Sequence, residues 1–369
     1  MSVSVSEAFT EKLRWKSNNI DSSQVEAVLH QQHLDIHDLP ILLSATAAKY
    51  LPQMAERSHR QTLQRFGANL QLFLPLYLSN LCTNICTYCG FSADAPIKRT
   101  WLRPHQLEDE VESLKQKNVE HLLLVTGEAE HKIGLEYFCK TLQELRPHFA
   151  NLLLESQPFS EQEYRELAQA GLDGVVVYQE TYNKNVYSSV HKRGKKQDFS
   201  WRLNTPERIA KAGIDKIGMG ILLGLADWRE DALALAEHLH SMQKKYWQQR
   251  YSISFPRLRP CASAFDIPCP VTDREFIQLV VAFRLCFPDV ELVLSTRESA
   301  TMRNALLPLG ITHLSAEAST QPGGYSENSA KALKQFDISD ERSLAEIQSV
   351  IEGLGYMPVL ADQIPVRSL

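Results

Sequence analysis

The stretch PLYLSNLCTNICTYCGFS, residues 75–92, decides how the rest of the chain is interpreted. It places Cys82, Cys86 and Cys89 in one short segment, in the spacing C-x3-C-x2-C. Cysteine thiolates bind zinc and iron–sulfur clusters, and such sites usually have four protein ligands. Three cysteines leave one coordination position open for another ligand. The pattern therefore predicts a metal site that carries out chemistry.

Two simpler interpretations of these cysteines stay open at this point. They could be buried thiols that happen to cluster, or half of a structural zinc site. No second C-x2-C pair or histidine pair lies nearby to complete a zinc site. We interpret the remaining cysteines as scattered core or surface thiols: Cys139, Cys261, Cys269 and Cys286.

Composition restricts the class of protein. The chain has 369 residues, of which 44% are hydrophobic and 22% charged, as in ordinary globular proteins. The net charge of −5, without a basic block, gives no reason to expect a nucleic-acid partner. We see neither a membrane-spanning apolar run nor an apolar signal core, so we expect no membrane association and a cytoplasmic location. Seven cysteines without regular pairing fit a reducing compartment.

From Leu72 onward, short apolar runs alternate with polar segments long enough for helices. Near-continuous apolar runs are typical of strands in a parallel sheet that is buried on both faces. Eight repeated strand–helix units predict a closed (β/α)8 barrel of the TIM type, with an open doubly wound sheet as the alternative. The expected strands are LFLPLY (72–77), HLLLVT (121–126), NLLLES (151–156), GVVVYQ (174–179), KIGMGIL (216–222), YSISF (251–255), ELVLST (291–296) and THLSA (312–316).

The segments around the barrel have their own patterns. Residues 1–70 have helical apolar spacing, with Asp21 as the expected N-cap of a second helix, and form a predicted N-terminal helical extension. The barrel is expected over residues 71–325, and a helical tail packed on it over 326–369. The basic segment 184–201, between the fourth and fifth strands, is expected to be a long excursion with a solvated charged face.

Polar residues occur where the predicted strands end, and active sites of such barrels are built at the carboxyl ends of the strands. A charged group buried there is costly unless it has a partner. We therefore expect these groups to face a ligand or one another, although any single one could form a structural ion pair. They are Thr126, Gly127, Glu128, Glu155, Glu180, Arg297 and Ser315.

The chain also resembles a known enzyme family. The cysteine spacing, with Tyr88 before the last cysteine, resembles the signature of radical S-adenosylmethionine (SAM) enzymes. The segments HLLLVTGE, GLDGVVVYQETY, AGIDKIGMGILLGL, LSTRES and TQPGGY are similar to the tyrosine lyases of thiamine biosynthesis, or 2-iminoacetate synthases. The resemblance implies a carbon–carbon lyase that cleaves L-tyrosine to 2-iminoacetate and p-cresol for the thiazole moiety of thiamine. SAM would be consumed to methionine and 5′-deoxyadenosine.

The resemblance also assigns candidate roles to single positions. It implies that a [4Fe–4S] cluster is held by Cys82, Cys86 and Cys89, with SAM on the fourth iron. It implies that SAM is contacted by Thr126, Gly127 and Glu128 at its amino group, Tyr88 and Phe91 near adenine, and Glu155 and Arg202 near the ribose and carboxylate. It implies an amino-acid pocket lined by Tyr77 and Arg297, with Glu180 and Ser315 as further candidates. The alternative role of Arg297 is a structural salt bridge with Glu298 or another carboxylate.

The partners implied by the family are an electron donor such as flavodoxin or ferredoxin, and thiazole synthase as the acceptor of the product. Three alternatives stay open: a tryptophan lyase, a tyrosine-cleaving maturase of [FeFe]-hydrogenase, and a non-enzymatic iron–sulfur scaffold. The maturase carries a second cluster near its C-terminus, whereas no cysteine follows Cys286 here. A scaffold would leave the polar strand ends unexplained.

Overall fold

The computed structural model describes residues 19–259, 265–326 and 335–361. Cys261, residues 1–18 of the predicted extension, and parts of the predicted tail lie outside these ranges. The strands are β1 (Asn69–Ser79), β2 (Ile85–Cys86), β3 (His121–Thr126), β4 (Asn151–Glu155), β5 (Gly174–Glu180), β6 (His191–Arg193), β7 (Lys216–Ile221), β8 (Arg250–Ser254), β9 (Glu291–Leu294), β10 (His313–Ser315) and β11 (Met357–Val359). The α-helices are α2 (Ser22–His30), α3 (Leu39–Leu42), α4 (Leu51–Phe66), α5 (Pro104–Lys115), α6 (Leu135–Leu145), α7 (Glu161–Gln169), α8 (Lys184–Val190), α9 (Phe199–Leu203), α10 (Thr205–Lys211), α11 (Trp228–Lys245), α12 (Asp273–Cys286), α13 (Ala300–Leu306) and α14 (Leu344–Gly353), and the 3-10 helices are η1 (Ala47–Tyr50), η2 (Lys195–Gln197) and η3 (Leu307–Leu309).

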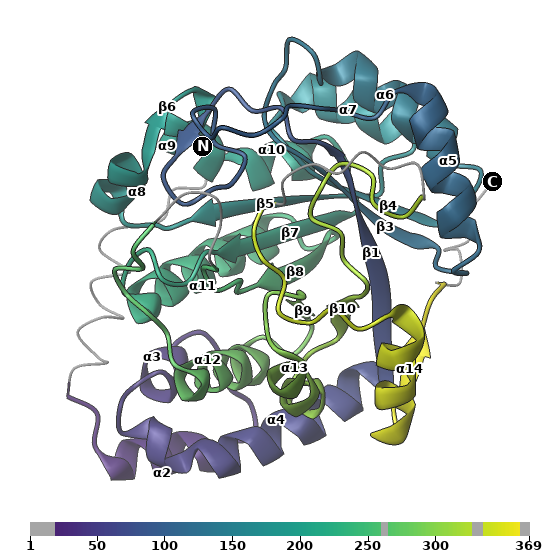
Figure 1. Ribbon diagram of the computed structural model, residues 1–369. Helices are drawn as coiled ribbons and strands as arrows, with labels where there is room; N and C mark the ends of the chain where they lie inside the picture. The colour runs from purple at the N-terminus through teal and green to yellow at the C-terminus, as the bar shows by residue number, and fades with distance from the viewer. Residues whose placement is uncertain (1–18, 260–264, 327–334, 362–369) are drawn as a thin grey trace.

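In the described part of the chain, eight parallel strands form a closed ring with helices outside it (Figure 1). The order around the ring is β1-β3-β4-β5-β7-β8-β9-β10. The ring closes where Gln71 of β1 is in register with His313 of β10. An open doubly wound sheet has no such pairing between its edge strands. The predicted (β/α)8 barrel is therefore confirmed, and each of the eight predicted strands is present.

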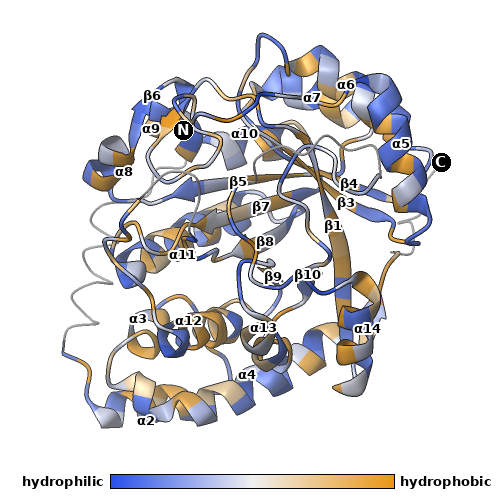
Figure 2. Cartoon of the chain, in the orientation of Figure 1, coloured by the Kyte–Doolittle hydropathy of each residue, from blue (hydrophilic) through white to orange (hydrophobic). Residues whose placement is uncertain are grey.

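Burial on both faces explains why these segments form strands. Every residue of β3 is buried, and the helices around the ring turn their apolar sides toward it. Helix α11 illustrates this, because Leu235 and Leu239 are fully buried, whereas the Asp227 carboxylate caps its first turn by accepting from two backbone N–H groups. Figure 2 shows the same division, with orange strands inside and helices that alternate orange and blue outside.

The extension before the barrel is helical, as expected from the sequence. Asp21 caps α2 in a capping box with Gln24, which confirms the predicted N-cap. Helix α4 packs against α12, and the Ser58 hydroxyl donates to the Leu309 carbonyl. These helices lie below α12 and α13 in the view of Figure 1. The extension therefore buries the outer surface of the barrel helices near α12.

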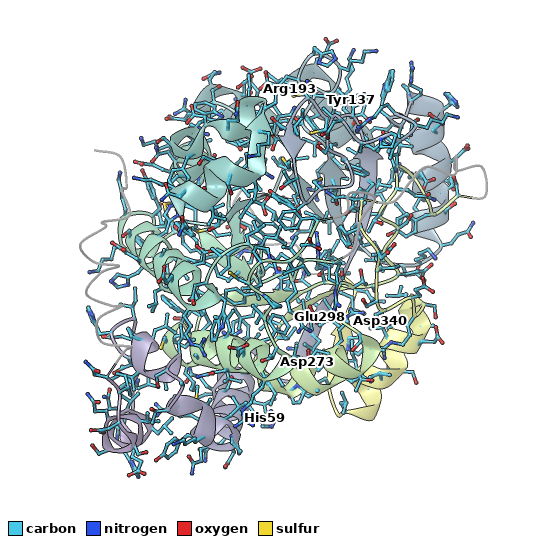
Figure 3. All side chains as sticks on the ribbon, turned by 60° about the vertical axis from the view of Figure 1, so that its left-hand side comes forward. His59, Tyr137, Arg193, Asp273, Glu298 and Asp340 are labelled. Atoms are coloured by element: carbon cyan, nitrogen blue, oxygen red, sulfur yellow. The ribbon has the colours of Figure 1, made fainter. Side chains whose placement is uncertain are left out.

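The C-terminal region contains more than a helix. After α14 the chain forms β11, which pairs in parallel with the start of β1, with Met357 opposite Asn69. The sequence analysis predicted only a helical tail and missed this strand. Upstream, Asp340 forms a fully buried ion pair with Arg303 of α13, and Arg303 also donates to the Ser315 carbonyl. Asp340 is labelled in Figure 3. The predicted domain limits at residues 70 and 325 stay predictions.

The buried Arg303–Asp340 pair leads to a test of stability. Asp340→Asn removes one charge and leaves the Arg303 guanidinium buried without its counterion, so we expect the free energy of unfolding to fall by about 3–5 kcal/mol. Thermal and denaturant unfolding of the metal-free protein measure this. Glu136→Gln, which breaks an exposed ion pair with Lys140 on α6, is the matched control and should leave the melting curve almost unchanged. Equal melting curves for the two variants would contradict the expectation.

Candidate functional site

The cysteine segment, residues 80–92, begins directly after β1, at the carboxyl end of the barrel. It is held from both sides. Ile85 and Cys86 form the short strand β2, which pairs antiparallel with β6 in the excursion between β5 and β7. The Arg99 guanidinium donates to the carbonyls of Asn80 and Phe91 at 2.8 and 2.9 Å. The loop geometry is thus fixed by hydrogen bonds to the chain itself.

The three cysteines line one pocket and are free thiols. Burial raises the pKa of each thiol, and for Cys89 burial together with the nearby Cys82 raises it to about 11. A buried thiolate without a counterion is costly, whereas coordination to iron stabilises the deprotonated form. These thiols are therefore suited to a metal cofactor and poorly suited to exist as free anions.

The geometry fits a cluster better than a single ion. In the described ranges, no group of three or more His, Cys, Asp or Glu side chains is arranged to hold one metal ion. Thiols that bind different irons of one cluster do not need to converge on a single point. Cys89 Sγ also accepts from the Phe91 N–H at 3.4 Å and from Gln335 Nε2 at 3.9 Å. Hydrogen bonds to the sulfurs are a feature of iron–sulfur sites.

The loop after β3 packs directly on the cysteine segment. A Cβ atom at Gly127 would lie 2.3 Å from the Leu81 carbonyl oxygen and 3.0 Å from Cys82 Cβ. The sequence analysis placed this glycine among the residues that contact the amino group of SAM. The structure adds a second requirement, because the cysteine segment itself leaves no room for a side chain at this position. Next to it, Thr126 Oγ1 is buried and has no hydrogen-bond partner in the described part of the chain, which suits a polar group of a bound cofactor.

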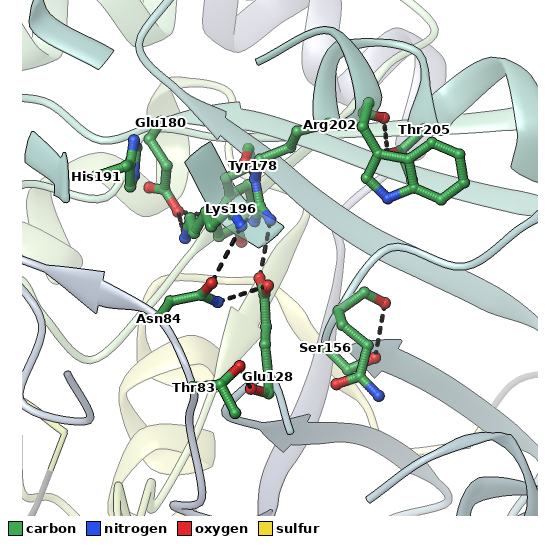
Figure 4. Close-up of polar contacts among 12 residues, drawn as sticks. Thr83, Asn84, Glu128, Ser156, Tyr178, Glu180, His191, Lys196, Arg202 and Thr205 are labelled. Carbon is green, nitrogen blue, oxygen red and sulfur yellow. Dashed lines mark hydrogen bonds and ion pairs between the residues drawn. The ribbon is translucent and has the colours of Figure 1, made fainter. Parts of the chain in front are cut away.

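Two carboxylates and two cations form a buried network across the pocket (Figure 4). Glu128 accepts from Arg202 Nη1 at 3.0 Å and from Asn84 Nδ2 at 2.7 Å. Glu180 accepts from Lys196 Nζ at 2.7 Å and lies 3.8 Å from Arg202. The network joins the loop after β3, the end of β5, the cysteine segment and the excursion. Its formal charges balance.

The network keeps Glu180 and Lys196 ionised. Burial opposes the charged form of Glu180, but Lys196 and Arg202 outweigh it and lower the pKa of this carboxyl. Burial and the Arg202 charge likewise oppose the charged form of Lys196, yet Glu180 and other anionic groups raise the Lys196 pKa above its ordinary value. The attraction between opposite charges thus exceeds the cost of desolvation for both Glu180 and Lys196.

A neutral histidine orients the aromatic ring of the cysteine motif. Burial, followed by the charge of Lys196, lowers the pKa of His191 to about 3. His191 Nδ1 lies 2.8 Å from the Tyr187 carbonyl, which can only accept, so Nδ1 carries the proton. His191 Nε2 then accepts from the Tyr88 hydroxyl at 2.8 Å. This bond fixes the ring of Tyr88 against the pocket.

The sequence analysis missed Lys196, Asn84 and His191. It predicted a solvated charged face for the segment 184–201, and for Lys196 that prediction was wrong, because this side chain is buried in the pocket wall. A usable signal was Gly194, whose φ of +95° and lack of Cβ let the excursion approach Asn84. Pattern analysis alone treats such a glycine as an ordinary turn.

A second, deeper pocket lies inside the barrel, next to the one lined by the cysteines. It is lined in part by Tyr77 and Ser315, as predicted for the amino-acid pocket. The Tyr77 hydroxyl donates to Gln335 Oε1 at 2.8 Å, and Ser315 Oγ accepts from the Thr296 N–H at 3.1 Å. Glu180, the other predicted pocket residue, lines only the cysteine pocket. Both pockets share several wall residues, which are Glu155, Tyr178, Pro256, Arg297, Gln335 and Phe336.

Arg297 is available to a ligand. Its guanidinium stacks on the Phe336 ring at 3.5 Å from the ring centroid. Glu298 forms ion pairs with Arg257 and Arg259 instead (Glu298 is labelled in Figure 3). The alternative salt bridge between Arg297 and Glu298 is therefore wrong. In the described residues no carboxylate lies within ion-pair distance of the Arg297 guanidinium.

The remaining positions predicted for the cofactor lie together in the cysteine pocket. Its lining includes Tyr88, Phe91, Thr126, Gly127, Glu128, Glu155 and Arg202. The ring of Phe91 also packs edge-on against Tyr77, with centroids 6.0 Å apart. The barrel thus brings the three cysteines, the predicted SAM contacts and the predicted amino-acid pocket into one continuous region.

Comparison with known proteins places the chain in a family. The model of the radical SAM superfamily matches residues 76–236, and that of the Biotin and Thiamin Synthesis associated domain matches residues 254–357. The 2-iminoacetate synthase of Escherichia coli (strain K12) is 47% identical over 351 residues, covering 95% of this chain and 93% of the relative. The chain belongs to the 2-iminoacetate synthase family. The 2-iminoacetate synthase of Salmonella typhimurium matches at the same identity and coverage.

Solved structures agree with membership of this family. HydG, a maturase of the [FeFe]-hydrogenase, superposes with a TM-score of 0.90 at 27% identity, covering 97% of this chain and 80% of that chain. Methylornithine synthase, at 18% identity and a TM-score of 0.73, shares the fold. The 47% identity to 2-iminoacetate synthase favours that family over the maturases and over a non-enzymatic scaffold. Radical SAM proteins use a [4Fe–4S] cluster and SAM, and the three thiols fit this pair.

No α-helix in the described ranges combines the length and the hydrophobicity that crossing a membrane requires.

The cysteine assignment predicts a sharp difference between thiols. Replacing Cys82, Cys86 or Cys89 by Ala removes one iron ligand, so the cluster absorption and SAM cleavage should be lost. Cys139→Ala, in α6, is the control and should keep both. Iron and sulfide content with visible absorption after anaerobic reconstitution measure the outcome. Full cluster loading in the variant that lacks all three ligands would exclude this site.

The Gly127 contact predicts that a small side chain there disturbs the cluster as well as SAM binding. In Gly127→Ala the new Cβ overlaps the Leu81 carbonyl, so the cysteine segment must shift, and cluster content should fall together with SAM affinity. Gly353→Ala at the end of α14 is the matched control, because a Cβ there meets nothing within 4 Å. Both quantities are measured on one sample. Normal cluster loading in Gly127→Ala would show that the contact does not matter.

Proposed function

We propose that this chain catalyses the reaction for which its family is named, with L-tyrosine as the substrate and 2-iminoacetate and p-cresol as the products. SAM is consumed to methionine and 5′-deoxyadenosine. The observation that carries the proposal is a pocket lined by three cysteines that adjoins a deeper, largely apolar pocket, in a chain 47% identical to a 2-iminoacetate synthase. The cluster and SAM, when bound, supply the radical that starts the cleavage.

The cysteine pocket supports binding of SAM. Its charged network offers Arg202 to a carboxylate, and the unpartnered Thr126 hydroxyl and the Glu128 carboxylate to an ammonium. Tyr88 and Phe91 supply flat apolar surface in the same wall, which suits the adenine ring. The Lys196 ammonium lies 5.9 Å from the centre of the Tyr88 ring, so this side chain adds positive charge close to the cysteines.

The deeper pocket supports binding of an aromatic amino acid. Phe73, Leu123, Val176 and Met219 line it, and this apolar surface can hold an aromatic ring and exclude water from a radical reaction. Arg297 lies at the wall shared with the cysteine pocket and can hold a carboxylate through two charge-assisted hydrogen bonds. An amino acid bound in this way would have its side chain in the barrel and its polar end next to the cofactor.

The proposed reaction needs partners. A low-potential cluster requires an electron donor such as flavodoxin or ferredoxin. The product 2-iminoacetate is unstable in water, so direct transfer to thiazole synthase is the route that we propose. The free thiols and the oxygen sensitivity expected of an open cluster support a cytoplasmic location.

The decisive experiment is anaerobic reconstitution of the cluster followed by incubation with SAM, a reductant and L-tyrosine. Chromatography should detect p-cresol and 5′-deoxyadenosine, both dependent on tyrosine. Formation of 5′-deoxyadenosine without p-cresol would contradict the proposed substrate. A parallel incubation with L-tryptophan separates this activity from that of a tryptophan lyase, and cleavage of tryptophan in preference to tyrosine would overturn the proposal.

Arg297 can be tested by a conservative change. Lysine keeps the positive charge but cannot form the two parallel hydrogen bonds of a guanidinium, so Arg297→Lys should weaken tyrosine binding about tenfold or more while SAM still binds. The control is Arg165→Lys on α7, whose guanidinium pairs with Glu161 at the surface. Tyrosine dependence, SAM affinity and melting temperature are measured together. Normal tyrosine affinity in a stable Arg297→Lys enzyme would rule out this role.

A further inference from the structure

Among the described residues that line the cysteine pocket, one carboxylate has no counterion. Three glutamates line the pocket, and two of them belong to the balanced network: Glu128 is bonded to Arg202 and Glu180 to Lys196. Glu155 has neither a hydrogen bond nor an ion pair from its carboxyl group in the described part of the chain. A carboxyl at this depth that keeps its oxygens toward a pocket is suited to an incoming cation.

Glu155 and Arg297 face the same place from different strands. Glu155 is the last residue of β4, and Arg297 follows β9 on the far side of the ring. Both line the cysteine pocket and the deeper pocket, so both lie at the boundary between the two. The Arg297 charge is felt at Glu155, yet the two groups are not within ion-pair distance of each other. An anion and a cation therefore stand apart across a space that a ligand can enter.

This arrangement matches the polar end of an amino acid, which carries an ammonium and a carboxylate on one carbon. We propose that Glu155 binds the ammonium of the substrate while Arg297 binds its carboxylate. The inference rests on the proposed function and names a further substrate-binding residue for it. It replaces the expectation that Glu155 contacts the ribose of SAM. The pair would hold the α-carbon at the boundary of the two pockets, with the aromatic ring inside the barrel.

The environment of Glu155 gives this contact a pH dependence. Burial, and then the negative charge of Glu180, raise the pKa of Glu155 to about 7, against the opposing effects of Arg297, Lys196 and Arg202. The phenols of Tyr77 and Tyr178 face the same carboxyl from β1 and β5. Only the ionised carboxylate attracts an ammonium. The contribution of Glu155 to substrate binding should therefore be present above pH 7 and be lost as the pH falls below it.

The test compares two ligands that differ only in the ammonium. These are L-tyrosine and 3-(4-hydroxyphenyl)propanoate, which has the same ring and carboxylate but no amino group. Their dissociation constants are measured anaerobically on the enzyme loaded with cluster and SAM, without reductant, so that no turnover occurs. The wild type should bind tyrosine about tenfold or more tightly than the analogue, as expected for a charge-assisted hydrogen bond. In Glu155→Gln the two constants should become nearly equal.

Two further measurements distinguish this role from others. Glu180→Gln is the matched comparison, and because Glu180 belongs to the network of the cysteine pocket, it should weaken SAM binding while the ratio of the two constants stays high. In the wild type the ratio should fall below pH 7, whereas in Glu155→Gln it should not change with pH. If the Gln variant does not load its cluster, Glu155→Ala is measured with the same expectation.

If the ratio of the two dissociation constants is unchanged in Glu155→Gln, the inference is overturned. If SAM binding is also weaker in this variant, Glu155 contacts SAM instead. Failure of the wild type to form p-cresol would overturn the proposed function instead. Because the ratio is measured by binding without turnover, the two failures can be told apart.

Discussion

The buried ion pair between Glu128 and Arg202 is the contact on which the site depends. Glu128 follows β3, and Arg202 lies in α9, 74 residues further along the chain. The same carboxylate holds Asn84 in the cysteine segment, and the same guanidinium lies close to Glu180 at the end of β5. Removing one member of such a pair leaves an uncompensated buried charge, which costs about 3–5 kcal/mol. Stability and the shape of the cofactor pocket therefore depend on the same charges.

The two pockets differ in the polarity of their walls. Around the cysteines the walls are charged, and their charges are already balanced within the protein. Inside the barrel the walls are mostly apolar. Glu155 and Arg297 lie at the boundary between the two pockets. A balanced network can hold a charged cofactor without a large change in electrostatic energy. Glu155 and Arg297 are not paired with each other, so under the proposed binding mode each of them gains an opposite charge from the zwitterion in a poorly solvated place.

The sequence predicted the barrel because the physical signal is local. A strand buried on both faces is mostly apolar, and most of the eight runs show this, although YSISF and THLSA also contain buried polar residues. Site residues at strand ends, such as Glu155 and Arg297, could be found for the same reason, since they interrupt or follow those runs. The C-terminal strand β11 was missed because MPV is too short to give a pattern.

The ion-pair partners of single side chains could not be predicted from the sequence, because these contacts join residues that are distant in sequence. In the sequence, Lys196 is one of several basic residues in a polar segment. Only the folded excursion brings its ammonium group next to Glu180. Glu298 follows Arg297 directly, yet its counterions are Arg257 and Arg259, which come from the segment after β8. Gly127 was predicted to contact SAM, but its packing against the cysteine segment was not predicted. The neighbouring loop packs so closely that it requires a residue without a Cβ atom at this position, and no single segment of sequence reveals that contact.

The pairing of β1 with both β10 and β11 has a consequence for biosynthesis. Strand β1, which leads into the cysteines, is synthesised early, whereas its partners on one side are near the end of the chain. Gln335, which donates to Cys89, is also made late. While the ribosome is still translating the middle of the message, the thiols are present but their surroundings are not. The complete pocket can therefore form only after β10, Gln335 and β11 have been synthesised.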